Sequence, residues 1–213
     1  MTPAAANMIA IEPLVMAQGI AKEYPGVRAL APITFTVAQG ERVALAGPSG
    51  SGKTTLLSLL AGMVQPDRGM ISLEGRDLSR MKPGRDLAGL VGMVNQGFDL
   101  VPQLPVIHNV LAGSLGEWGL FRSVLSFLWP RDRQIAEGVL EQLGIADKLD
   151  QRTSHLSGGE LQRLAIARIM VQSPRLILAD EPVSSLDPAR AEEILRLLTE
   201  LATSPGKTLI ASL

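Results

Sequence analysis

The fold is decided by residues 42–62, which read RVALAGPSGSGKTTLLSLLAG. The stretch starts with a short apolar run, passes through a loop rich in glycine and serine, and ends in a run typical of a helix. This strand–loop–helix order is the setting of the phosphate-binding loop, G-x-x-x-x-G-K-[ST], also called the Walker A motif. We therefore predict an α/β fold of the P-loop NTPase class, with a mixed or parallel sheet core that delivers the loop to a nucleotide.

The loop chemistry predicts ATP and Mg²⁺ as ligands. Glycines let the backbone curl so that its N–H groups point inward, and the helix that follows adds its positive end to the anion site. Lys53 would neutralise the β and γ phosphates, and the Thr54 hydroxyl would bind Mg²⁺, which prefers hard oxygen donors. The predicted nucleotide-binding residues here are Gly47, Pro48, Ser49, Gly50, Ser51, Gly52, Lys53, Thr54 and Thr55.

A second apolar run ends in two carboxylates. Residues 175–181 read RLILADE, as expected for a strand buried on both faces. Ligands bind beyond the carboxyl ends of such strands, so Asp180 and Glu181 should lie beside the phosphate loop. Asp180 suits the Mg²⁺ site, and Glu181 suits the general base for a water that attacks the γ phosphate. Taken alone, such a pair would more often be a solvated turn.

A third motif, LSGGE at residues 156–160, lies immediately ahead of an amphipathic helix. Ser157, Gly158, Gly159 and Glu160 there offer a hydroxyl and free N–H groups at a helix N-terminus. Taken alone the motif would usually be a cap and a turn. Because one nucleotide site is already complete, the second anion cradle predicts that two copies of the chain meet, each covering the γ phosphate held by the other.

Hydrophobic patterning predicts the organisation around these motifs. We expect an ATP-binding core over residues 12–98 and 156–213, interrupted by a helical subdomain over 99–155. Strands are expected over residues 42–46, 90–94, 176–179 and 208–211, with more antiparallel character over 29–37 and 69–74, which would give the N-terminal part a mixed sheet. Helices are expected over residues 53–62, 131–143, 160–172 and 188–203, the last capped by Asp187 with Pro188 at its first position.

The order GPSGSGKT, Gln96, LSGGE, LADEP and SSLD resembles that of ABC transporter ATPases over essentially the whole chain. The resemblance implies a head-to-tail homodimer with two ATP molecules sandwiched between phosphate loop and LSGGE segment. It implies that Tyr24 stacks on adenine, although a turn tyrosine is the alternative. It also implies that Gln96 senses Mg²⁺ and joins the catalytic residues Lys53 and Glu181, and that Asp187 contacts the dimer partner.

Within that family, residues 96–116 and 132–160 resemble phosphonate importers most closely. This resemblance implies import of phosphonate or a related oxoanion. It implies integral membrane permease subunits as partners and, indirectly, a periplasmic substrate-binding protein. It also implies that the chain is peripheral, on the cytoplasmic face of the bacterial inner membrane. The alternatives are the ATPase of a lipoprotein-type exporter, a DNA-repair-type ATPase head, a soluble factor with paired ATPase domains and a catalytically silent fragment. Missing coiled-coil heptads argue against the repair head, and a single phosphate loop argues against the paired factor.

Composition narrows the function classes further. The formal net charge is −1 and there is no cysteine, which gives no overall basic field for nucleic acid and excludes disulfides and thiolate chemistry. We expect no nucleic-acid partner. No apolar run reaches the roughly 20 residues that cross a bilayer. The apolar segment GLFRSVLSFLW, residues 119–129, packs within the helical subdomain or lines a groove for a helix of the membrane subunit.

The last strand, KTLIASL, reaches Leu213, whereas the family carries a histidine just after it that contacts the γ phosphate. The resemblance implies that the C-terminal part of the domain is missing. We therefore expect ATP binding to survive better than turnover, and residues 208–211 to lose neighbours that would normally cover them.

Overall fold

The computed structural model describes residues 13–82, 84, 86–95, 97–114, 130–184 and 187–213. Its strands are β1 (Val15–Tyr24), β2 (Val27–Val37), β3 (Arg42–Leu45), β4 (Arg68–Leu73), β5 (Arg76–Asp77), β6 (Val91–Val94), β7 (Leu176–Ala179) and β8 (Thr208–Ser212). Its α-helices are α1 (Lys53–Leu60), α2 (Val106–Leu111), α4 (Pro130–Gln142), α5 (Gly158–Gln172) and α6 (Pro188–Thr203). Short 3-10 turns lie at Leu78–Arg80, Ala112–Ser114, Ala146–Lys148 and Thr153–His155.

The strands form two sheets of four. One has the order β2-β1-β4-β5 and pairs antiparallel throughout, and the other has the order β3-β8-β7-β6 and pairs parallel throughout. Parallel and antiparallel strands are therefore both present, as predicted, but the N-terminal antiparallel strands make a sheet of their own instead of a mixed one. The parallel sheet is the one that carries the motif strands β3 and β7.

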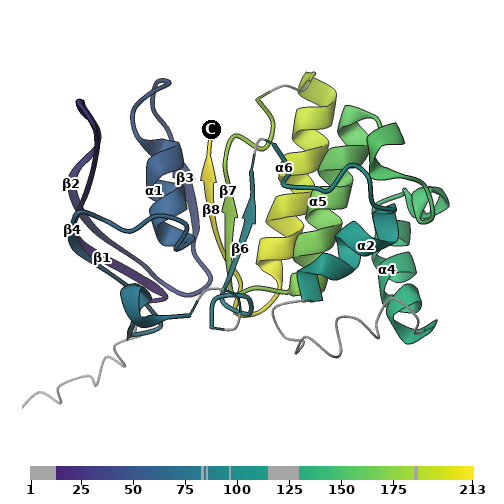
Figure 1. Cartoon of the computed structure of the whole chain (residues 1–213), viewed down its shortest axis with the longest axis horizontal. Helices are drawn as coiled ribbons and strands as arrows, with labels where there is room; N and C mark the ends of the chain where they lie inside the picture. The colour runs from purple at the N-terminus through teal and green to yellow at the C-terminus, as the bar shows by residue number, and fades with distance from the viewer. Residues whose placement is uncertain (1–12, 83, 85, 96, 115–129, 185–186) are drawn as a thin grey trace, which may run out of the picture.

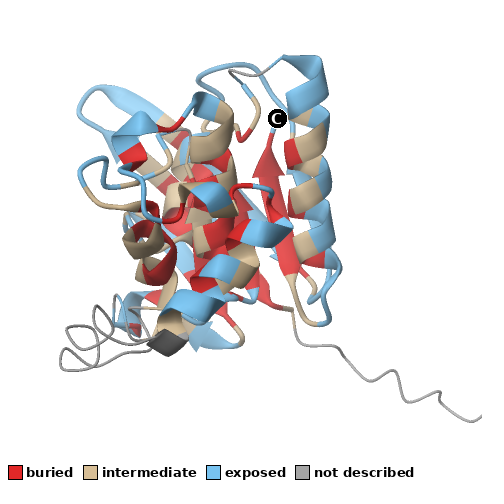
Figure 2. Cartoon of the chain, turned by 90° about the vertical axis from the view of Figure 1, so that its right-hand side faces the viewer, coloured by how far each residue is buried: buried red, intermediate tan, exposed pale blue. Residues whose placement is uncertain are grey.

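The two sheets and the helices are arranged in layers (Figure 1). Helix α1 lies between the antiparallel sheet and the parallel sheet, and its buried leucines pack in one cluster with strands of both. Helices α5 and α6 cover the other face of the parallel sheet, and α2 and α4 pack outside α5. Covering both faces is what a parallel sheet requires, because its strands are apolar on both sides. Figure 2 shows the buried strands behind helices whose outer faces are exposed.

The sequence patterns placed most elements correctly. Helix α6 has the predicted bounds, because the Asp187 side chain accepts a hydrogen bond from the Arg190 N–H and Pro188 takes the first helical position. Helix α5 begins two residues before the prediction, at Gly158, so both glycines of LSGGE lie in its first turn. The other predicted strands and helices are present with bounds shifted by at most two residues.

Strand β1 was not predicted, and the reason is its irregular register. Its pairing with β2 shifts between Ala17 and Ile20, between Ile20 and Lys22, and between Lys22 and Glu23. Each shift changes which side chains face the core, so the alternation of apolar and polar residues that marks a strand is broken. Gly19, with φ 58°, lies at one of these bulges.

The expectation that residues 208–211 would be left uncovered is wrong. Strand β8 lies between β3 and β7 in the parallel sheet, and all of its residues are buried. A central strand has both of its hydrogen-bonding edges paired and both faces covered. The edges of this sheet are instead β3, which alternates between exposed and half-buried residues, and β6.

The predicted helical subdomain has described residues 99–114 and 130–155. Leu140 of α4 and Val110 of α2 are fully buried in the same hydrophobic cluster as Leu164 of α5 and Ile177 of β7. The helical segment therefore shares a continuous core with the ATP-binding core beneath it. Its limits at residues 99 and 155 remain a prediction, and the apolar segment 119–129 lies outside the described residues, as does residue 12, the predicted start of the domain.

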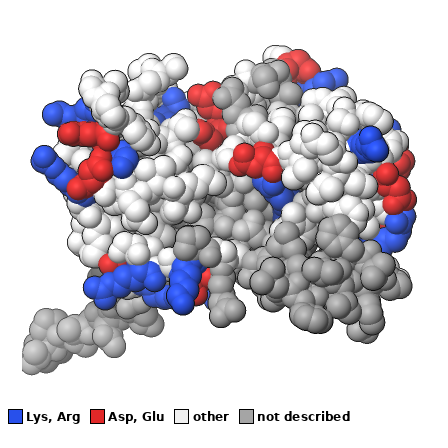
Figure 3. Space-filling view, in the orientation of Figure 1, with Lys and Arg blue, Asp and Glu red and all other residues white. Residues whose placement is uncertain are grey.

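Charges on the face seen in Figure 3 are interspersed, with Lys and Arg next to Asp and Glu. That face has no broad field of one sign. Among the described residues, no helix is long and apolar enough to cross a membrane.

Candidate functional site

The phosphate loop joins β3 to α1 in the conformation that an anion site needs. Gly50 and Gly52 have φ of 80° and 94°, and Gly52 is the N-cap of α1. A Cβ atom on Gly52 would lie 2.5 Å from the backbone oxygen of Ala29, so only glycine fits there. The Lys53 ammonium bonds the backbone oxygens of Gly47, at 2.7 Å, and Pro48, at 3.3 Å. The lysine thus lies across the loop where phosphates would be cradled.

Strand β7, which is followed by the carboxylate pair, ends beside this loop, as predicted. The Thr54 hydroxyl lies 3.2 Å from Asp180 Oδ1, although the two residues are 126 positions apart in the chain. Asp180 is buried at 6% exposure at the carboxyl end of β7. Two of the predicted metal ligands are therefore brought together. The third, Gln96, lies outside the described residues.

Glu181 follows Asp180 with its backbone in the left-handed region, at φ 45°. That conformation costs a residue other than glycine roughly 1–2 kcal/mol, so surrounding contacts must hold it. The Glu181 N–H donates to Ser212 Oγ at 2.8 Å, and Ser184 donates to the Glu181 carbonyl oxygen from both its N–H, at 3.3 Å, and its hydroxyl, at 3.2 Å. Glu181 is therefore fixed at both ends of its backbone.

A pocket of about 240 Å³ opens over the loop. It is lined by residues 49–55 of the loop and helix start, by Glu181, and by Val27, Arg28 and Ala29 at the start of β2. Lys53, Thr54 and the predicted base thus face one space. The β2 residues were missed by sequence reasoning, because nothing in the local pattern indicates that the antiparallel sheet reaches over the phosphate loop.

Tyr24 ends β1 and pairs across the hairpin with Val27, which lines the pocket. The tyrosine is 45% exposed, and the Lys22 ammonium lies 5.5 Å from its ring centroid. Its position at the rim, next to a pocket residue, is compatible with stacking on a base. That role remains a prediction.

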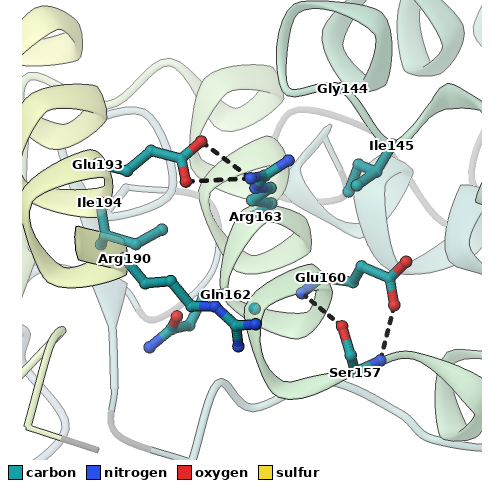
Figure 4. Close-up of a pocket in the computed structure, with 10 residues that line it drawn as sticks. Gly144, Ile145, Ser157, Glu160, Gln162, Arg163, Arg190, Glu193 and Ile194 are labelled. Atoms are coloured by element: carbon teal, nitrogen blue, oxygen red, sulfur yellow. Dashed lines mark hydrogen bonds and ion pairs between the residues drawn. The ribbon is translucent and has the colours of Figure 1, made fainter. Parts of the chain in front are cut away.

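The LSGGE segment forms a capping box (Figure 4). The Ser157 hydroxyl accepts from the Glu160 N–H at 3.4 Å, and the Glu160 carboxylate accepts from the Ser157 N–H at 2.7 Å. The hydrogen bond from the Ser157 N–H is the largest cause that lowers the pKa of Glu160. The Ser157 hydroxyl and the charge of Lys148 lower this pKa further. Glu160 therefore stabilises the start of α5, and contact between its carboxylate and a phosphate remains a prediction.

A cavity of about 220 Å³ lies beside this cap, between α5 and α6. Arg163 spans it with a forked ion pair to Glu193, at 2.9 and 3.0 Å (Figure 4). Arg190 of α6 also lines the cavity, 3.9 Å from where a Cβ of Gly159 would lie. The predicted second anion cradle thus has a cation within reach that the sequence motifs did not indicate. Asp187, predicted to contact the dimer partner, caps α6.

Arg168 is a further residue that the motifs missed. Its guanidinium donates to the backbone oxygens of Asp99, at 2.7 Å, and Phe98, at 3.0 Å, and so ties α5 to the segment just after residue 96. Burial lowers the pKa of Arg168. Phe98 and Asp99 both have positive φ, at 60° and 47°, so this turn needs such an anchor.

Comparisons with known proteins agree with this site. The ABC transporter family model matches residues 30–184. The chain is 48% identical to Phosphonates import ATP-binding protein PhnC 1 of Pseudomonas aeruginosa, over 88% of this chain and 71% of that protein. It is 46% identical to Phosphonates import ATP-binding protein PhnC of Pseudomonas putida, over 92% of this chain and 73% of that protein.

Solved structures show the same fold. The dimeric ATP-binding cassette MJ0796 in a post-hydrolysis state with ADP and Pi has a TM-score of 0.82 and 28% identity, covering 93% of this chain and 87% of that one. The phosphate loop, the carboxylate-ended strand and the LSGGE cap therefore define an ATP-binding cassette. The chain belongs to the ABC transporter family and, within it, to the phosphonate import ATP-binding proteins.

Proposed function

We propose that this chain binds and hydrolyses ATP, with Mg²⁺, to energise an ABC importer of phosphonate or a related oxoanion. The observation that carries the ATPase part is the convergence of Lys53, Thr54 and Glu181 on one pocket, with Asp180 hydrogen-bonded to Thr54 beside it. The oxoanion part is supported by the relatives, which are named as phosphonate import ATP-binding proteins.

The residues have separate tasks in this proposal. The N–H groups at the start of α1 and the Lys53 ammonium hold the β and γ phosphates and neutralise their charge. The Glu181 carboxylate accepts a proton from a water whose oxygen attacks the γ phosphorus, while the bond from phosphorus to the ADP oxygen breaks. The strained backbone of Glu181 supports this role, because strain of this kind is held where side-chain placement matters.

The donor set fits Mg²⁺. The Thr54 hydroxyl and the Asp180 carboxylate are hard oxygen donors, and their oxygens lie 3.2 Å apart beside the phosphate loop. When bound, Mg²⁺ would neutralise charge that develops on the phosphate oxygens. Gln96 is the remaining proposed ligand from the sequence.

A homodimer through the ATP sandwich is supported by two observations. The Ser157 and Gly159 cradle lies away from the chain's own phosphate loop, at the cavity between α5 and α6. The cassette MJ0796, which shares the fold, is described as dimeric. In the proposed dimer each LSGGE segment covers the γ phosphate bound by its partner. Asp187 would contact the partner copy as well as capping α6.

The membrane side of the proposal follows from the family. The dimer would dock beneath integral permease subunits on the cytoplasmic face of the bacterial inner membrane, and a periplasmic substrate-binding protein would deliver the oxoanion to them. The apolar segment 119–129 is the proposed lining of the groove that receives a permease helix. Replacing Phe121 and Trp129 by serine should weaken co-purification with the permease, and unchanged assembly would contradict that part.

Growth on phosphonate tests the oxoanion assignment. The chain would be expressed in a bacterium whose own phosphonate import ATPase gene is deleted, with methylphosphonate as the sole phosphorus source. We expect growth from the wild-type chain and none from the Lys53→Ala variant, whose phosphate loop lacks its cation. Active ATP hydrolysis in vitro without growth, while the deleted gene restores growth, would retain the ATPase and overturn the oxoanion assignment.

A further inference from the structure

Ser212 is the last residue of β8 and is fully buried. Its hydroxyl accepts a hydrogen bond from the Glu181 N–H at 2.8 Å and donates one to Asp180 Oδ1 at 2.8 Å. One hydroxyl therefore bonds both residues of the carboxylate pair. Strands β7 and β8 are neighbours in the parallel sheet, so this contact is made directly across the strand ends.

We propose that Ser212 is a positioning residue for hydrolysis, setting Glu181 and Asp180 relative to the phosphate loop. The inference rests on the proposed ATPase function. Asp180 Oδ1 is shared between the hydroxyls of Ser212 and Thr54, so the chain Ser212–Asp180–Thr54 links β8 to the first turn of α1. Ser212 is not among the residues that line the pocket, and it acts through these two partners.

The backbone of Glu181 explains why a hydroxyl is needed there. Its left-handed conformation turns the chain after β7, and its N–H donates to the Ser212 hydroxyl. A buried N–H without a partner is unfavourable, so the conformation depends on an acceptor at the end of the adjacent strand. Ser212 provides that acceptor while its own proton fixes the Asp180 carboxylate.

The same strand contains a matched control at its other end. Thr208 is also fully buried, and its hydroxyl accepts from the Gly40 N–H at 2.9 Å, far from the phosphate loop. Thr208→Val and Ser212→Ala each remove one buried hydroxyl of β8 that accepts from a backbone N–H. Their effects on stability should therefore be similar, whereas only Ser212 contacts the site.

The test measures ATP hydrolysis, ATP affinity with and without Mg²⁺, and melting temperature for the whole chain and its variants. For Ser212→Ala we expect kcat to fall about tenfold or more, because a displaced base and metal-side carboxylate act on the chemical step. The gain in ATP affinity that Mg²⁺ provides should also shrink. Thr208→Val should change the melting temperature alone, and Ser212→Thr, which keeps the hydroxyl, should restore kcat.

Ser212→Cys provides a second variant of similar size should Ser212→Ala fail to fold, since a thiol is a weak donor and acceptor. Equal kcat values and equal Mg²⁺ effects in the Ser212 and Thr208 variants would overturn the positioning role. A wild-type chain that binds ATP without hydrolysing it would instead contradict the proposed ATPase function, and the Mg²⁺ effect on affinity would then decide the Ser212 inference separately.

Discussion

The Thr54 hydroxyl and Asp180 Oδ1 lie 3.2 Å apart, and this contact joins the phosphate loop to the strand that ends in the carboxylate pair. The two motifs come from distant parts of the chain, on strands β3 and β7, with β8 between them. Because all of these strands run parallel, their carboxyl ends lie at the same end of the sheet. The contact therefore follows from the topology and not from local sequence.

Thr54→Val should weaken the Mg²⁺ dependence of ATP binding. The variant keeps the shape of the side chain and the backbone N–H groups of the loop, so ATP binding in EDTA should change little. The affinity gained on adding Mg²⁺ should fall by at least about tenfold, as expected when an oxygen ligand is lost. Isothermal titration of ATP with and without Mg²⁺ measures both values.

Ser58→Ala is the matched control, because it removes a hydroxyl from the same helix that bonds only the Thr54 backbone oxygen at 2.8 Å. It should retain the full effect of Mg²⁺. An unchanged effect of Mg²⁺ in Thr54→Val would show that this hydroxyl is not a metal ligand.

Leu140→Ala should destabilise the whole chain and not the helical segment alone. Leu140 is fully buried, and its side chain belongs to the same hydrophobic cluster as residues of α5 and β7. Removing a buried leucine side chain typically costs about 2–5 kcal/mol. We expect urea unfolding, followed by circular dichroism and by tryptophan fluorescence, to give one coincident transition shifted to lower urea. A separate early transition that leaves ATP binding intact would show that the helical segment unfolds on its own.

Stability should fall as pH drops below neutral, in part because of His108. Burial lowers the pKa of this imidazole in the folded chain. In the unfolded chain the pKa of the His108 imidazole is about 6.5. Just below that pH the imidazole is therefore more protonated in the unfolded state than in the folded state. His108 therefore contributes stability above about pH 6.5, which is lost as pH falls through its folded pKa.

His108→Gln should make the free energy of unfolding less sensitive to pH between about 7.5 and 5.5, a window in which unfolded carboxyl groups stay ionised. Urea titrations of both proteins at these two pH values measure the difference. Equal losses in the wild-type chain and the variant would rule out a contribution from His108.

The parts of the fold that sequence predicted are those with local signals. The bounds of α6 followed from Asp187 and Pro188, and the phosphate loop followed from its glycines and lysine. Strand β1 was missed because its bulges break the alternation of side chains, and α5 began earlier than expected because its two glycines are helical. The bulges of β1 depend on pairing with distant strands and leave no local signal, whereas the capping box of Ser157 and Glu160 was a local signal for the start of α5.

The candidate site was predictable where a motif names its residues, and not where neighbouring strands supply them. Ser212 is a single polar residue at the end of an apolar strand, and only the pairing of β7 with β8 places it on Asp180. Arg168 and the start of β2 also lie at or near the site only because distant segments of the chain pack together. A rule that could have found Ser212 is to examine polar residues at the carboxyl ends of all predicted parallel strands.

Magnesium-dependent ATP hydrolysis by the wild-type chain, compared with Glu181→Gln, tests the central claim most directly. The glutamine keeps the size of the side chain and removes the carboxylate that would accept the proton of the attacking water. We predict that both proteins bind ATP with similar affinity and that the variant loses hydrolysis by about a hundredfold or more. Equal hydrolysis by the two proteins, or no ATP binding by either, would contradict the account.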